Sequence, residues 1–156
     1  MDKTQREIRG LMITVAGGRL LLPNANVSEI ITAANREPIA DAPPWLLGRV
    51  RWRGWRVPLV SMSLLAGLAA RDDSPNAKVA VLKGMSANPR LPYIAILSIG
   101  FPRLTTVSPE NLVATALGDV PMPGMRTGVM LNDQSAFIPD LPEVERLIDD
   151  ELSKAT

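Results

Sequence analysis

Short apolar runs, each ended by glycine, proline or asparagine, make up most of the first 140 residues. Turn signals recur about every ten residues, which is typical of domains built only from β-strands. No stretch before residue 140 has the period of a long amphipathic helix. The pattern therefore predicts an all-β domain.

A hairpin is predicted near the start of the chain. The runs 11–16 and 19–23 flank a Gly-Gly pair, which supplies the positive φ angles of a primed turn. After this hairpin, Asn26 and Glu29 have the spacing of a capping box. We therefore expect one helical turn to follow the second strand.

A second hairpin joins residues 48–53 to residues 55–62, with Arg53 and Gly54 at the turn. Along a strand, alternate side chains point to opposite faces. One parity holds Arg49, Arg51 and Arg53, and the other holds Val50 and Trp52. The hairpin should therefore present its guanidinium groups on one face.

The polar segment 70–76 marks a boundary between two halves, a first barrel over about 9–68 and a second over about 76–150. Further strands are predicted over 78–84, 92–99, 103–107, 127–131 and 135–139. We expect 92–99 and 103–107 to form a hairpin, and likewise the last two strands through Asn132 and Asp133. A brief helical turn is expected at Ser108–Glu110.

The chain ends in a predicted helix. Asp140 and Glu143 have the spacing of a capping box, and Pro142 falls in the first turn. Its apolar positions share one face and are Leu141, Val144, Leu147, Ile148 and Leu152. This stripe predicts docking onto a barrel.

The amino-acid composition excludes most of the common catalytic mechanisms. The 156 residues include no histidine and no cysteine, so a Ser/His/Asp triad, a thiol nucleophile and a Cys/His zinc site are excluded. No glycine-rich nucleotide loop is present. The carboxylates at 72–73 and 149–151 are interpreted as solvated charge. We expect no enzyme activity, no cofactor and no metal.

Neither a signal peptide nor a membrane span is expected. The first ten residues are polar and mixed in charge, and no apolar run approaches the roughly 18 residues that a span requires. The expected localisation is cytoplasmic.

The segment 49–56 carries four arginines and two tryptophans, although the whole chain has a net charge of only +1. Three interpretations remain open: a solvated basic hairpin, a nucleic-acid surface with aromatic platforms, and a protein docking site, where arginine and tryptophan are enriched. The pI of about 8.1 is low for a dedicated nucleic-acid domain. A small-barrel nucleic-acid-binding protein using 49–56 remains the alternative to protein docking.

Over residues 9–150 the chain resembles the CheW family of chemotaxis coupling proteins. That family carries a hairpin, a V-x-E-I element, a proline-containing loop and a G-V-x-N-L-R-G-x-x-x-P-V-V-D-L block. The corresponding pieces here are LMITVAGGRLLLP, VSEI, ADAPPWLLG and GRVRWRGWRVPLVSM. The resemblance implies two interlocked SH3-like five-stranded β-barrels and a non-catalytic adaptor.

The family also implies partners. Its adaptors join the cytoplasmic tips of chemoreceptors to the regulatory domain of the histidine kinase CheA, a two-component signalling system. The resemblance therefore implies recruitment from the cytoplasm to membrane-associated receptor arrays, without membrane insertion and without nucleic acid.

Site residues are implied position by position. Val27, Glu29, Arg53 and Gly54 match family positions associated with receptor docking or with shaping that groove. Glu29 and Arg53 can alternatively pair with each other and only fix the hairpin. The framework of the hairpin is implied to be Gly48 and Pro58.

Two dipeptides depart from the family pattern. Arg51 and Trp52 replace N-L, and Ser61 and Met62 replace D-L. The partner preference of this chain is expected to come from its additions, Arg49, Arg51, Trp52, Trp55 and Arg56. They suggest an accessory CheW-like protein, of a type IV pilus-associated chemosensory system.

Overall fold

A computed structural model of the chain describes residues 7–32, 35–119 and 121–154. The first of its two sheets contains β1 (Ile8–Val15), β2 (Gly18–Pro23), β8 (Arg103–Val107), β9 (Leu112–Thr115), β10 (Met125–Leu131) and β11 (Gln134–Pro139). The second contains β3 (Val27–Thr32), β4 (Leu46–Trp52), β5 (Trp55–Val60), β6 (Ala77–Lys83) and β7 (Tyr93–Ile99). The expected all-β class is confirmed. Residues 1–6, part of the polar N-terminal segment in which no signal peptide is expected, lie outside the described residues.

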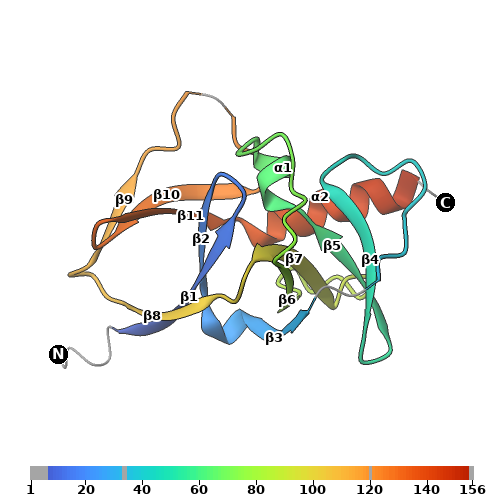
Figure 1. The fold of residues 1–156 in the computed structure, drawn as a ribbon, viewed down its shortest axis with the longest axis horizontal. Helices are drawn as coiled ribbons and strands as arrows, with labels where there is room; N and C mark the ends of the chain where they lie inside the picture. Colours follow the sequence, from blue (N-terminus) through green and yellow to red (C-terminus); the bar gives the residue numbers. More distant parts are fainter. Residues whose placement is uncertain (1–6, 33–34, 120, 155–156) are drawn as a thin grey trace.

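The two sheets lie side by side, the first on the left of Figure 1 and the second on the right. Their strand orders are β8-β1-β2-β11-β10-β9 and β3-β6-β7-β5-β4. Each sheet takes strands from both sides of segment 70–76, because β11 pairs with β2 and β7 pairs with β5, both in parallel. The barrels are therefore interlocked through the chain itself.

Apolar residues form three clusters, because the central strands are buried on both faces. In β6, Val79 and Val81 pack inside the second sheet, whereas Ala80 and Leu82 face a core shared by both sheets and the helices. The third cluster lies against the first sheet around Met12. Burial on both faces explains why these strands read as continuous apolar runs rather than as alternating ones.

Short helical elements complete the fold: η2 (Asn24–Asn26), α1 (Met62–Ala66) and α2 (Leu141–Lys154). The Asp140 carboxylate accepts a hydrogen bond from the Glu143 N–H at 3.2 Å, which confirms the predicted N-terminal cap of α2. The Glu143 side chain does not reach back to Asp140 but accepts from the Gly124 N–H at 3.1 Å. The apolar stripe of α2 docks on the shared core, as expected.

The capping box predicted at Asn26 and Glu29 is wrong. The helical turn, η2, ends at Asn26, and Glu29 lies in the middle of β3. The β-branched residues of VSEIIT favour a strand, and β3 pairs with β6. Only Gly17 of the Gly-Gly pair has positive φ, at 80°, and Gly18 begins β2.

The hairpin predicted between 92–99 and 103–107 is also wrong. Both segments are strands, but β7 pairs with β6 and β5, whereas β8 crosses to the first sheet and pairs with β1. Residues 108–111 form a turn instead of a helix and lead into β9, which the sequence did not predict. The remaining hairpins, β1–β2, β4–β5 and β10–β11, are confirmed.

Candidate functional site at the β4–β5 hairpin

The turn between β4 and β5 consists of Arg53 and Gly54, as the sequence predicted. Their φ angles are 49° and 82°, so both lie in the left-handed region required by a two-residue primed turn. Val50 and Trp52 are buried while Arg51 is exposed, which confirms the expected alternation. The turn brings Trp52 directly opposite Trp55.

Glu29 connects the hairpin to β3. One of its carboxylate oxygens, Oε1, accepts hydrogen bonds from Trp52 Nε1 at 3.1 Å and from an Arg53 terminal nitrogen at 3.0 Å. The Arg53 guanidinium also lies 4.9 Å from the centre of the Trp52 ring. Because β3 and β4 are the two edges of the second sheet, these side chains join its edges. Val27, in the same strand as Glu29, is half-buried and packs on the shared core.

Glu37 forms a second ionic cluster that sequence reasoning missed. Its Oε1 accepts from Arg51 Nε at 3.0 Å, and its Oε2 accepts from two Arg56 nitrogens at 3.0 and 2.6 Å. Its backbone exchanges two 2.8 Å hydrogen bonds with Arg49. Hydrogen bonds from Arg51 and Arg56 hold the pKa of Glu37 below its ordinary value. Fourteen residues separate Glu37 from Arg51, with no periodicity to link them.

Gly48 makes room for this arrangement. Its φ is 139°, and a Cβ atom built there would lie 2.6 Å from the backbone oxygen of Glu37. Pro58 lies opposite Arg49 in the β4–β5 ladder. Both framework residues therefore lie beside the point where residue 37 pairs with β4.

The aromatic residues divide into buried and exposed members. Trp52 is 7% exposed and packs edge-on against Tyr93, with ring centres 4.8 Å apart. Trp55 is 47% exposed and lies 5.8 Å from the same Tyr93 ring. A hollow of about 360 Å³ is lined by the six residues of the turn region, Arg51 to Arg56. The structure thus gathers the predicted residues from Arg51 to Trp55 around one open site.

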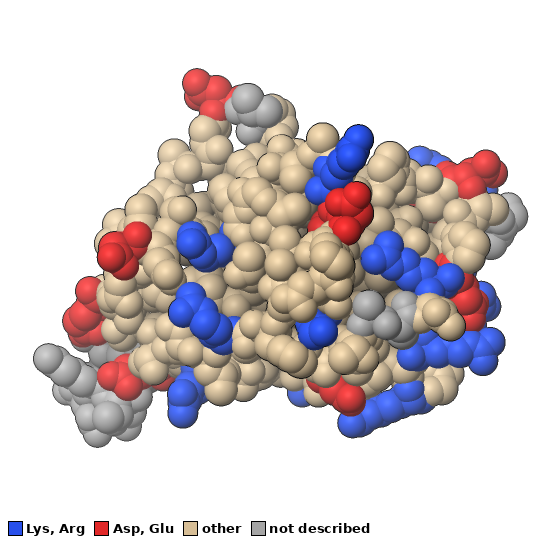
Figure 2. All heavy atoms as spheres, in the orientation of Figure 1, with Lys and Arg blue, Asp and Glu red and all other residues tan. Residues whose placement is uncertain are grey.

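Charge gathers at this end of the molecule. In Figure 2 lysine and arginine atoms cluster at the lower right, where Figure 1 places the β4–β5 hairpin, with carboxylate atoms beside them. The side chains of Arg51, Arg53 and Arg56 are 81%, 69% and 59% exposed despite their ion pairs. The surface is therefore cationic, and ion pairs with Glu29 and Glu37 hold its arginine side chains in place.

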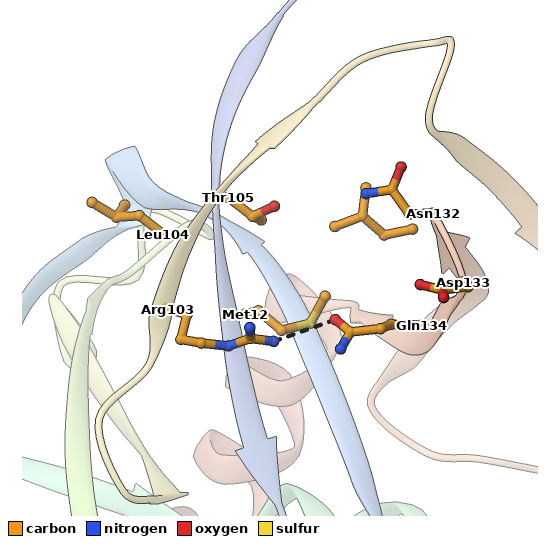
Figure 3. Close-up of a pocket in the computed structure, with 8 residues that line it drawn as sticks. Met12, Arg103, Leu104, Thr105, Asn132, Asp133 and Gln134 are labelled. Carbon is orange, nitrogen blue, oxygen red and sulfur yellow. Dashed lines mark hydrogen bonds between the residues drawn. The ribbon is translucent and has the colours of Figure 1, made fainter.

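A second hollow, of about 240 Å³, lies on the first sheet (Figure 3). It is bordered by Met12, Arg103 and the β10–β11 turn, and Arg103 donates a 3.3 Å hydrogen bond to Gln134. None of the sequence-predicted site residues lines it. Within the described residues no acidic cluster suited to a metal ion occurs.

The CheW-like domain model matches residues 9–150 of the chain. The chain belongs to the CheW-like family. Its fold is similar to that of the scaffolding protein TtCheW from Thermoanaerobacter tengcongensis, with a TM-score of 0.71 and 12% identity over 86% of this chain and 89% of that chain. No curated protein matches the chain in sequence. In the described part of the chain, no helix is long and apolar enough to cross a membrane.

At Ser61, where the CheW family pattern has an acidic residue, a carboxylate from another part of the chain lies nearby. Ser61 is buried, and its hydroxyl donates a 2.5 Å hydrogen bond to Asp72 while accepting one from the Leu64 N–H, which caps α1. The expectation that Asp72 is simply solvated is therefore wrong. A carboxylate from segment 70–76 lies beside the position where the family pattern has an acidic residue.

Proposed function

We propose that this CheW-like chain is a non-catalytic adaptor that couples chemoreceptors to a CheA-type histidine kinase. Family membership over residues 9–150 supports a chemosensory scaffold. The expected partners are the cytoplasmic tip of a chemoreceptor and the regulatory domain of the kinase, bound by two separate surfaces. The chain acts by binding at membrane-associated receptor arrays, from the cytoplasm.

We assign one of these surfaces to the region around Val27, Glu29 and Arg53. The observation that carries this assignment is the bonding of Trp52 and Arg53 to a single oxygen of Glu29, which fixes the exposed hairpin relative to β3. A rigid, exposed arginine loses little conformational freedom on binding, which favours affinity. The additions at positions 49–56 support an accessory adaptor, serving a pilus-associated system.

The test is co-sedimentation of the purified chain with receptor-containing membranes and kinase. Arg53→Glu should weaken co-sedimentation by about thirtyfold or more, because one well-placed arginine can carry about 2 kcal/mol of an interface. Arg103→Glu makes the same charge change on the other sheet and should bind normally. Unchanged binding of Arg53→Glu would remove the assignment of this surface. If the unmodified chain co-sediments with neither the receptor-containing membranes nor the kinase, the adaptor function is wrong.

A further inference from the structure

We infer that the open end of the β4–β5 hairpin recognises an acidic segment of a partner protein, one that carries an aliphatic side chain next to its carboxylates. This inference deepens the proposed function by naming the chemistry of the partner at that site. It rests on residues that this chain adds to the family pattern, Arg51, Trp55 and Arg56.

The arginine side chains are held in place by carboxylates, but not all of their N–H donors have a partner among the described residues. Arg51 donates to Glu37 only through Nε, and Arg53 donates to Glu29 through one terminal nitrogen, in the described residues. Each guanidinium therefore keeps N–H groups directed to solvent. Because Glu29 and Glu37 already hold these side chains, a carboxylate that binds them meets a preorganised site.

An apolar contact lies beside the charged one. Trp55 and Arg56 line the hollow at the turn and also a smaller one of about 70 Å³, whose lining includes Pro58, Pro92, Tyr93 and the cation Arg90. The two hollows therefore share Trp55 and Arg56 in their linings. The smaller one suits a small aliphatic side chain, and it lies next to the guanidinium of Arg56.

The same observations disfavour nucleic acid. Three of the four arginines at 49–56, Arg51, Arg53 and Arg56, donate to two carboxylates, Glu29 and Glu37. A continuous phosphate backbone would approach both carboxylates, whereas a short acidic peptide needs only a few contacts. Base stacking also requires exposed rings, and of Trp52 and Trp55 only Trp55 is open to solvent.

The test uses the full chain and a Gly/Ser-based synthetic peptide that carries paired Glu residues next to Leu. Binding is followed by the NMR shift of the Gly54 backbone N–H, which lies in the hollow and is present in every variant, as the peptide is added at low salt. We expect saturable binding that weakens as salt rises. Arg56→Glu and Trp55→Ala should each weaken it by about tenfold, and Arg103→Glu should leave it unchanged.

Two control ligands separate the alternatives. A peptide with Gln in place of Glu should bind at least about tenfold more weakly, since the guanidinium groups select for negative charge. Equal binding of the Gln peptide, or no binding of the Glu peptide, would overturn the inference. So would tighter binding of a single-stranded oligothymidylate with a steep salt slope. If the acidic peptide does not bind but co-sedimentation is normal, the inference is overturned and the adaptor function is retained. If the peptide binds but the chain does not co-sediment with receptor or kinase, only the adaptor function is overturned.

Discussion

The hydroxyl of Ser61 donates a 2.5 Å hydrogen bond to the carboxylate of Asp72, which joins the end of β5 to the segment between the two halves of the chain. Ser61 is fully buried, so its polar atoms depend on these partners. The same oxygen accepts from the Leu64 N–H at the start of α1. One side chain therefore fixes both a helix start and a connecting segment.

Ser61→Ala should lower the free energy of unfolding by about 1–3 kcal/mol, because it removes a helix cap and leaves the half-buried Asp72 carboxylate without its donor. Urea unfolding followed by circular dichroism measures this loss. Asp73→Ala is the matched control, since the neighbouring carboxylate is exposed, and it should change stability by less than about 0.5 kcal/mol. Equal effects of the two substitutions would contradict the role of Ser61.

Replacing Glu29 separates its two hydrogen-bond donors. Glu29→Gln keeps an acceptor for the Trp52 indole and loses only the exposed ion pair with Arg53, so it should cost less than about 1 kcal/mol. Glu29→Ala leaves the nearly buried indole N–H without its acceptor and should cost about 1–3 kcal/mol. Denaturant titration of both variants checks the order. A loss from Glu29→Gln as large as that from Glu29→Ala would show that the ion pair dominates.

The Glu37 cluster predicts an acid-sensitive contribution to stability. Hydrogen bonds from Arg51 and then Arg56 lower the folded pKa of Glu37 below its ordinary value of 4.5. A lowered folded pKa contributes stability above the unfolded value, and this contribution is lost as the pH falls through the folded pKa. In Arg51→Gln the carboxyl resonance of Glu37 should titrate at higher pH than in the unmodified chain.

The measurement is carbon NMR of the labelled glutamate side chains across the acidic range. Glu37→Gln identifies the resonance by its disappearance. Arg103 lies in the first sheet, far from the Glu37 cluster, so Arg103→Glu should leave the titration of Glu37 unchanged. A Glu37 titration unaffected by Arg51→Gln would contradict the assigned cause.

The two glycines of the hairpin region should respond differently to alanine. Gly54→Ala meets no atom within 4 Å and costs only the strain of its positive φ, about 1 kcal/mol. Gly48→Ala places its Cβ 2.6 Å from the Glu37 carbonyl and must displace the segment paired with β4. Thermal unfolding should therefore show a larger loss for Gly48→Ala, accompanied by a rise in the pKa of Glu37. Similar losses without that rise would argue against a close approach at Gly48.

Glu145 on α2 is 1% exposed, and the predicted apolar stripe of the helix does not include it. Its carboxylate accepts from the Met85 N–H, the Ser86 N–H and the Ser86 hydroxyl, at 2.7 to 3.1 Å. Glu145→Ala should cost about 2–4 kcal/mol, since it removes the acceptor of the Met85 and Ser86 backbone N–H groups in the loop after β6. Asp150→Ala, on the exposed side of the same helix, should cost less than about 0.5 kcal/mol by the same denaturant titration. A small effect at Glu145 would show that water replaces it.

Local signals predicted the local structure well. The Arg53-Gly54 turn, the hairpin through Asn132 and the Asp140 cap each depend on neighbouring residues, and each is present in the structure. Strand pairing was predicted wrongly where the next strand in sequence is not the partner, as at β8. Pairing across long separations depends on the packing of whole sheets, which local patterns do not encode.

The same distinction applies to the site. The resemblance located Glu29 and Arg53, and their pairing was one of the two interpretations offered. Glu37 and Tyr93 were missed because they reach the hairpin from a proline-containing loop and from β7, on opposite sides of it in sequence. Asp72 and Glu145 were missed because nothing local distinguishes a carboxylate with buried partners from a solvated one.

The parallel pairing of β2 with β11 and of β5 with β7 has a consequence for folding. Leu20 lies beside Phe137, so the first sheet is complete only when the two ends of the chain have met. Such non-local topologies have high contact order and fold slowly. Because neither sheet can be assembled from one half alone, unfolding should be a single cooperative event. A docking surface on one barrel should then disappear together with the other barrel, not independently of it.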